Sequence, residues 1–118
     1  PRSSMSPTII LKDGRPTLVI GSPGGSRIIG YVAEAIVAHI DWGMNVQAAV
    51  SIPHAINRFG TYDLEKGTSL EGMVAPLEEL GYKVSLRSLN SGLHAISIGE
   101  NGLFGGADPR REGIAIGQ

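Results

Sequence analysis

The feature that most constrains the fold is the stretch LVIGSPGGSRIIGYVAEAIV, residues 18–37, where an apolar run of strand length is followed at once by a helical pattern. The turn between them contains two adjacent glycines, Gly24 and Gly25. The first backbone N–H groups of a helix have no intrahelical partner, and together with the helix dipole they attract anions. Because glycine has no Cβ, a ligand can approach closely. The turn therefore predicts a site for a phosphate, a carboxylate or the oxyanion of an acyl-transfer intermediate.

The common phosphate-binding motifs do not fit this turn. A P-loop has a lysine directly after its glycines, whereas Ser26 and Arg27 follow here. Residues 21–26 also lack the G-x-G-x-x-G spacing of a dinucleotide site. A simpler interpretation is that the glycines only allow the helix to pack closely on the sheet. The residues alone leave both interpretations open, a close packing contact and an oxyanion site.

Two strands and a long helix are predicted in the first part of the chain. Residues 8–11 and 17–20 are β-branched runs of strand length, and residues 12–16 between them contain an Asp-Gly hairpin signal. A helix is expected over residues 25–41, with Gly43 as its stop. The helix is apolar on most sides, which is typical of a helix packed between other elements. Its predicted core stripe comprises Ile28, Ile29, Val32, Ile36 and Ile40.

The rest of the chain adds two shorter helices and further strands. A helix over residues 45–51 has Asn45 as its N-cap, and another over residues 69–80 ends at Gly81. The predicted buried face of the later helix is Val74, Leu77 and Leu80. Further strands are predicted at residues 82–86, 94–98, 102–105 and 113–116. Strand runs that flank helices favour an α+β fold with an antiparallel sheet covered by helices, and the length suits a single domain, residues 1–118.

Composition excludes several classes of function. The net charge of -1 and the pI near 6.3 give no basic footprint for nucleic acid. Without cysteines the chain has no disulfide or thiol chemistry, and it has neither a signal-peptide pattern nor an apolar run long enough to span a membrane. The three histidines, His39, His54 and His94, lack metal-ligand spacing; His54 is interpreted as structural and His39 as structural or exposed. No cofactor and no metal are expected.

A serine pair near the start of the chain is the second candidate feature. Ser3 and Ser4 are adjacent hydroxyls immediately before the first predicted strand. They fit an ordinary Ser-rich turn, or they could donate hydrogen bonds to a polar substrate. The late stretch Asp108-Pro109-Arg110-Arg111 is interpreted as a turn that holds the tail by ion pairs, with a role in assembly as the alternative.

Three segments together resemble the γ-glutamyltranspeptidase (γ-glutamyltransferase) family of N-terminal-nucleophile hydrolases. They are the residues SSMSPTI at 3–9, GSPGGSRI at 21–28 and GADPRR at 106–111. The resemblance spans nearly the whole chain. It implies a four-layer αββα sandwich, of which this chain would be the C-terminal segment of the small subunit. It also implies that a threonine freed by autocleavage attacks the γ-glutamyl carbonyl of glutathione-like donors, and that water or an acceptor resolves the acyl-enzyme.

The resemblance also implies roles for individual residues. Gly24 and Gly25 match the glycine pair whose backbone N–H groups form the oxyanion hole, and Ser3 and Ser4 match the serines that hold the substrate α-carboxylate. The nucleophilic threonine is absent, because the threonines of this chain (Thr8, Thr17, Thr61 and Thr68) are internal and lack the free amine that serves as the base. The chain is therefore expected to need the remainder of the enzyme, namely the nucleophile-bearing segment and the large subunit.

Further expectations concern the isolated chain. Alone it should be inactive, and its apolar helix layer should favour a homo-oligomer. If the source is bacterial, the resemblance implies a periplasmic or secreted protein. The alternatives are a non-catalytic domain that binds carboxylates or serves assembly, and a tautomerase in which the amine of Pro1 is the general base. The chain begins at Pro1 without an initiator methionine, and it reads as part of a longer sequence.

Overall fold

The computed structural model describes residues 3–117, and these form two compact units. Unit 2 is Pro53–Asn90, and unit 1 comprises the chain before it, up to Ile52, and after it, from Ser91. Each unit combines strands with helices, so the predicted α+β class is confirmed. The description of residues 1–118 as a single domain stays a prediction.

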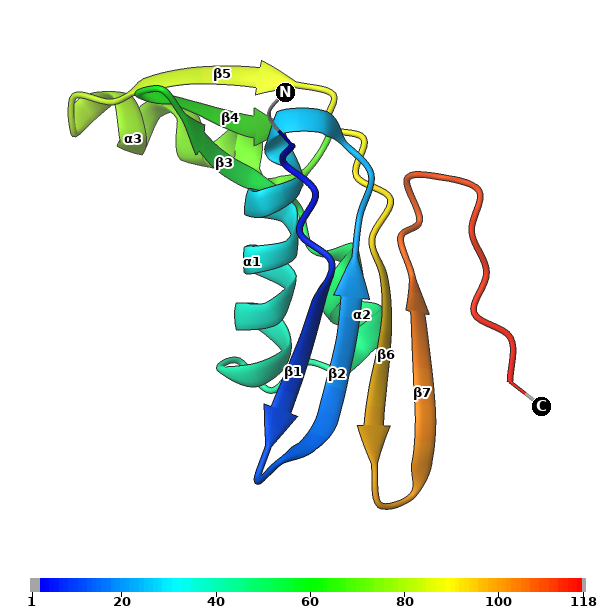
Figure 1. Cartoon of the computed structure of the whole chain (residues 1–118). Helices are drawn as coiled ribbons and strands as arrows, with labels where there is room; N and C mark the ends of the chain where they lie inside the picture. The colour runs from blue at the N-terminus through cyan, green and yellow to red at the C-terminus, as the bar shows by residue number, and fades with distance from the viewer. Residues whose placement is uncertain (1–2, 118) are drawn as a thin grey trace. The chain divides into compact units, whose positions relative to one another are not determined.

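Unit 1 contains a four-stranded antiparallel sheet. Its strands are β1 (Thr8–Lys12), β2 (Arg15–Gly21), β6 (His94–Gly99) and β7 (Gly102–Ala107), in the order β1-β2-β6-β7 (Figure 1). The predicted hairpin between β1 and β2 is confirmed. Its turn residues Asp13 and Gly14 both have positive φ, 52° and 76°, as in the two-residue turns that match the twist of a hairpin.

One long helix packs on this sheet. A 3-10 turn, Gly25–Arg27, leads into α1 (Ile28–Ile40), and Gly43, with φ of 69°, follows the helix as predicted. The predicted core stripe is partly wrong, because Ile29 and Ile40 are 59% and 52% exposed. The residues that α1 buries are Ile28, Tyr31, Val32, Ala35 and Ala38. The small alanines bring the helix backbone close to its neighbours, so the apolar side chains on the opposite face stay exposed.

A short helix, α2 (Val46–Ser51), covers the same sheet near β7 (Figure 1). The predicted N-cap is confirmed, since the Oδ1 atom of Asn45 accepts a hydrogen bond from the N–H of Ala48 at 2.8 Å. The α2 backbone lies directly on β7, because a Cβ on Gly106 would lie 2.9 Å from the carbonyl oxygen of Val46. Beside it, the Gln47 amide exchanges hydrogen bonds with the N–H and C=O of Ala107 at 3.0 and 2.8 Å.

The prediction of a strand at residues 113–116 is wrong. This tail has no strand pairing, and Ile114 and Ile116 are 74% and 79% exposed. Ala115 instead packs against the sheet at Gly105, where a Cβ would lie 2.7 Å from the Ala115 Cβ. Alternating apolar residues form a strand only when their backbone groups also pair with another strand. Here the tail, as far as residue 117, contacts β7 through the side chain of Ala115 and not through backbone hydrogen bonds.

Unit 2 is a three-stranded sheet in the order β3 (Ala55–Arg58), β4 (Thr61–Glu65), β5 (Lys83–Arg87). The β3–β4 pair is antiparallel, whereas β4 and β5 are parallel. A parallel pair needs a crossover connection, which the 3-10 turn Ser69–Met73 and the helix α3 (Val74–Glu79) provide.

The predicted buried face of this third helix is wrong at one position. Val74 and Leu77 are half-buried, but Leu80 is 73% exposed. The reason is that α3 ends at Glu79, so Leu80 no longer follows the helical periodicity. Gly81, with φ of 90°, terminates the helix as predicted, and its N–H donates to the carbonyl oxygen of Glu78 at 2.9 Å.

Candidate functional site

The turn from β2 to the helix has an unusual backbone. Gly24 and Gly25 have φ of 138° and 62°, a combination that residues with a side chain rarely adopt. The carbonyl oxygen of Gly25 already accepts the N–H of Ile28, so helical hydrogen bonding begins at this glycine. The N–H groups of Gly24 and Gly25 precede the first helical bond, and within the described residues 3–117 they donate no hydrogen bond.

The two glycines have different surroundings. A Cβ on Gly24 would lie 2.8 Å from Cε2 of Tyr31, whose ring is buried, whereas a Cβ on Gly25 would meet no atom within 4 Å. Gly24 thus fits the packing interpretation, since only glycine allows this approach to the Tyr31 ring. Packing does not explain Gly25, which is exposed and faces open space. A ligand that approached this turn would meet the backbone of Gly25 without steric hindrance.

Strand register brings the serine pair to the same end of the sheet as the glycine pair. Thr8 pairs with Ile20 and Ile9 with Val19, so the chain that enters β1 and the chain that leaves β2 lie at the same end of the sheet (Figure 1). Ser3 and Ser4 precede β1 there, and the glycine turn follows β2. The two predicted motifs, about twenty positions apart in sequence, therefore belong to one end of unit 1.

The two serine hydroxyls are engaged differently. The Oγ of Ser3 accepts the N–H of Met5 at 3.2 Å, which is the Ser turn that the sequence offered as the structural alternative. The carbonyl oxygen of Ser4 accepts the hydroxyl of Ser6 at 3.1 Å. No hydrogen bond to the Ser4 hydroxyl occurs within residues 3–117, and Ser4 is half-buried. Both hydroxyls therefore keep a proton that they can donate to a ligand, because the Ser3 Oγ acts only as an acceptor in its turn.

A buried carboxylate lies behind this end of the sheet. Asp108 accepts hydrogen bonds from the hydroxyl of Ser91, the N–H of Leu93, and both the N–H and the guanidinium of Arg110. Burial raises the pKa of the Asp108 carboxyl, but the four hydrogen bonds together outweigh burial and lower that pKa below its ordinary value of 3.8. The predicted ion pair in this turn is confirmed, at 3.0 Å between Asp108 and Arg110.

The segment fixed by Asp108 also contacts the glycine turn. The N–H of Gly92 donates to the Oγ of Ser22 at 3.1 Å, and this Oγ donates to the carbonyl oxygen of Pro23 at 2.6 Å. A Cβ on Gly92 would lie 2.7 Å from Cγ of Pro23, so the proline ring packs directly on the glycine. Sequence reasoning missed Ser22 and Gly92, because their partners lie far apart along the chain and no local pattern signals the contact.

Two of the histidine rings contact backbone carbonyl oxygens, and the third histidine lies in the interior. The Nδ1 atom of His39 lies 2.7 Å from the carbonyl oxygen of Met44, and that of His94 lies 3.0 Å from the carbonyl oxygen of Gly92. His54 is fully buried, and its backbone N–H donates to the Glu65 carboxylate at 2.9 Å. Within residues 3–117 no cluster of three or more His, Asp or Glu could hold a metal. Pro1, the base of the tautomerase alternative, lies outside the described residues.

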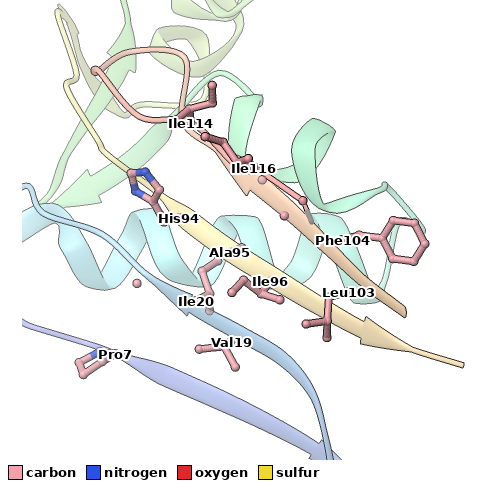
Figure 2. A pocket seen from close by; sticks show the side chains of 15 residues that line it. Pro7, Val19, Ile20, His94, Ala95, Ile96, Leu103, Phe104, Ile114 and Ile116 are labelled. Carbon is pink, nitrogen blue, oxygen red and sulfur yellow. The ribbon is translucent and has the colours of Figure 1, made fainter. Parts of the chain in front are cut away.

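The face of the unit 1 sheet opposite the helices carries an open apolar groove of about 1130 Å³. Figure 2 shows Val19, Ile96 and Leu103 on three adjacent strands, with Ile114 and Ile116 contributed by the tail. None of the four predicted site residues lines the groove within the described part of the chain. The groove is thus separate from the glycine turn. No helix among residues 3–117 is long and apolar enough to cross a membrane.

Unit 1 has an α+β fold. In it, one strand of an antiparallel sheet leads through a double-glycine turn into a helix. Comparison with known proteins names the family, because the gamma-glutamyltranspeptidase sequence model matches residues 1–118. The chain belongs to the gamma-glutamyltranspeptidase family.

Relatives and solved structures agree with this assignment. The glutathione hydrolase proenzymes of Escherichia coli (strain K12) and Bacillus subtilis (strain 168) are 44% and 42% identical, over 93% and 99% of this chain. Gamma-glutamyltranspeptidase from Pseudomonas nitroreducens superposes with a TM-score of 0.89 at 30% identity, over 99% of this chain and 63% of its own. The match covers 19% and 20% of the two proenzymes, so the chain spans about a fifth of their length.

Proposed function

We propose that this chain is the C-terminal segment of the small subunit of a γ-glutamyltransferase, which transfers or hydrolyses the γ-glutamyl group of glutathione-like donors through a threonine acyl-enzyme. The threonine and the large subunit lie outside this chain in that proposal. The chain supplies the oxyanion hole at Gly24 and Gly25 and the substrate-carboxylate contacts at Ser3 and Ser4. Alone it is inactive, since its own threonines are internal.

The observation that carries this proposal is the open backbone at Gly25. Attack on an amide carbonyl places a negative charge on oxygen, and pre-oriented N–H groups in a partly water-excluded site stabilise that charge. The N–H groups of Gly24 and Gly25 precede the first helical hydrogen bond, next to open space at Gly25. The helix dipole adds to their effect on an anion. Both the geometry and the chemistry of the turn therefore support an oxyanion site.

The serine pair supports the choice of substrate. A γ-glutamyl group presents an α-carboxylate several bonds away from its reacting carbonyl, so its site needs hydrogen-bond donors at a distance from the oxyanion hole. Ser4 lies at the same end of the sheet as the glycine turn, and its hydroxyl has no partner within residues 3–117. Ser3 can also donate, because its Oγ accepts the N–H of Met5 through a lone pair and keeps its own proton.

The first test compares the chain alone with the complete proenzyme. The intact mass of the protein from its native source shows whether a nucleophile-bearing chain accompanies this one, and release of p-nitroaniline from a γ-glutamyl anilide measures activity. The proposal expects turnover only when the longer partner is present. A 12.4 kDa species without turnover and without a partner would favour the carboxylate-binding alternative. Turnover by that species alone would contradict the proposal, since it names no nucleophile here.

Two substitutions in the complete proenzyme separate the assigned roles. Gly25→Val places a β-branched side chain at a φ of 62°, which shifts the backbone and displaces the N–H, so kcat should fall by about 10²- to 10³-fold, as for loss of one oxyanion donor. Ser4→Ala should mainly raise KM, because a contact that is equal in ground and transition states contributes to binding alone. Ser6→Ala is the matched control, since its hydroxyl bonds only within the turn, to the carbonyl oxygen of Ser4. An unchanged kcat in Gly25→Val would contradict the oxyanion assignment.

A further inference from the structure

Several connected contacts join a buried carboxylate to the glycine turn. Asp108 binds the residues on both sides of Gly92, namely the hydroxyl of Ser91 and the N–H of Leu93. All three residues of this segment are buried, and so is Asp108. A carboxylate that accepts hydrogen bonds on either side of one glycine restricts the position of that glycine. Asp108 thus determines where Gly92 lies.

Gly92 in turn contacts the residues immediately before Gly24. Its N–H donates to Ser22 Oγ at 3.1 Å, and its Cα packs against the ring of Pro23 so closely that a Cβ would lie 2.7 Å from Cγ. On the other side of the turn, the buried Tyr31 ring lies against Gly24. A free glycine adopts many backbone conformations, so glycine alone would not fix this turn. Tyr31 on one side and the segment 91–93 on the other hold the glycine turn in place.

We propose that Asp108 is a positioning residue for the glycine turn: it fixes residues 91–93, and Gly92 fixes Ser22 and Pro23 so that the N–H groups of Gly24 and Gly25 keep one orientation. This inference rests on the proposed oxyanion role of that turn. In this proposal Asp108 contacts no reacting atom, and it acts on the glycine turn only through Gly92. A donor that is oriented before the reaction stabilises an oxyanion without reorganisation, so the orientation matters for the rate.

Arg110 anchors the other end of this arrangement. Its guanidinium bonds to Asp108 at 3.0 Å and to the carbonyl oxygen of Ile52 at 2.6 Å, and it reaches the carbonyl oxygen of Val50 at 3.4 Å. Asp108 is thus tied to the end of α2 as well as to the segment 91–93. The carboxylate is fixed on both sides, which a residue that positions others requires.

The test uses the complete, autoprocessed proenzyme and two variants that act on the same contact by different routes. Asp108→Asn weakens the hold on residues 91–93. Gly92→Ala leaves Asp108 in place and pushes on the Pro23 ring and on the flexible side chain of Arg111, whose Cδ would lie 2.9 Å from the new Cβ. Both should lower kcat per cleaved enzyme by roughly 10- to 100-fold, since a misplacement of about 1 Å costs on the order of 100-fold. KM for the γ-glutamyl anilide should stay unchanged, because the serine contacts are not altered.

A tetrahedral inhibitor gives a readout that a merely structural role would not move. A glutamate analogue with a boronic acid in place of the γ-carboxyl group forms an anionic tetrahedral adduct with the nucleophile, which resembles the transition state. Its affinity should fall by the same factor as kcat in Asp108→Asn and Gly92→Ala. The affinity for an uncleaved γ-glutamyl amide should fall far less, because its carbonyl oxygen carries no full negative charge in the ground state.

The matched control is Asp63→Asn in unit 2. Asp63 is also buried and pairs with an arginine, at 3.1 Å from Nε of Arg87, but it belongs to the other unit. This variant should lose stability without loss of kcat. The inference is overturned if Asp108→Asn and Asp63→Asn have the same kcat, or if Gly92→Ala keeps full kcat. Gly25→Val separates failure of this inference from failure of the proposed oxyanion site. If Gly25→Val loses activity and the Asp108 and Gly92 variants do not, the oxyanion role stands and the positioning role of Asp108 fails.

Discussion

At the scale of single residues, the Asp108 carboxylate makes the folded state sensitive to acid. Its pKa in the folded state lies below the ordinary value of 3.8, because four hydrogen bonds outweigh the effect of burial. Ionised Asp108 therefore stabilises the folded state fully at pH values above the pKa that its carboxyl has in the unfolded chain. This contribution is lost as the pH falls through the lower, folded pKa.

The corresponding prediction concerns the free energy of unfolding as a function of pH. In urea titrations of the complete protein between about pH 2 and 7, the difference in unfolding free energy between wild type and Asp108→Asn should be largest near neutral pH. It should shrink at acid pH, because protonated Asp108 loses its charged hydrogen bonds. Glu112→Gln is a control at an exposed carboxyl nearby and should leave the curve unchanged. A constant difference across the whole range would contradict the pKa assignment.

Single residues also show how far sequence reasoning reached in the candidate site. The ion pair of Asp108 with Arg110 was predictable because the two residues are neighbours in one turn. The glycine pair was predictable from the strand and helix on either side of it. The contact of Gly92 with Ser22 was not, because it joins positions separated by most of the chain. Local patterns report local geometry, whereas such a contact depends on how the strands are ordered in the sheet.

At the scale of elements, Gln47 joins the short helix α2 to the last strand. Its side-chain amide replaces a neighbouring strand at Ala107, donating to the C=O and accepting from the N–H. In Gln47→Ala these buried backbone groups lose both partners, which should cost about 1–3 kcal/mol of stability. Amide hydrogen exchange by NMR should show faster exchange at Ala107 in the complete protein.

The comparison variant for this element is Gln47→Glu. It keeps an acceptor for the Ala107 N–H but lacks the donor for the C=O, so exchange at this amide should stay slower than in Gln47→Ala. If both variants exchange at the wild-type rate, Gln47 does not protect the end of β7.

Prediction of elements was most reliable where a cap marked their ends. The sequence predicted three residues at helix ends, and the structure confirms all of them: Asn45, Gly43 and Gly81. The phase of α1 was not fixed, because apolar side chains lie on both of its faces, and propensity does not tell which face meets the sheet. The parallel β4–β5 pair was likewise beyond local patterns, since strand direction depends on the crossover between them.

At the scale of the whole molecule, one row of apolar side chains crosses the outer face of the unit 1 sheet. Ile9, Val19 and Ile96 are cross-strand neighbours and are 63%, 37% and 45% exposed. A second apolar face, with Ile29 and Ile40, lies along α1. Contiguous apolar surface of this kind is uncommon on a stable monomer. The isolated 118-residue chain should therefore self-associate, as light scattering after size-exclusion chromatography would reveal.

Charged substitutions can assign this self-association to one face. Ile96→Lys places a charge on the sheet face and Ile29→Lys on the helix face, and both side chains are already exposed. The variant on the face that mediates association should shift the isolated chain toward the monomer mass. An unsubstituted chain that stays monomeric at high concentration would show that neither face is adhesive.

The division of unit 1 by an inserted unit also affects the order of folding. Strand β2 pairs with β6, and the whole of Pro53–Asn90 lies between them in the chain. During synthesis, β1, β2 and α1 emerge before unit 2, and the sheet stays incomplete until unit 2 has been made. If unit 2 has folded by then, the loop that must close is effectively shorter and its entropic cost is lower. Early folding of unit 2 should therefore speed closure of the sheet that carries the glycine turn.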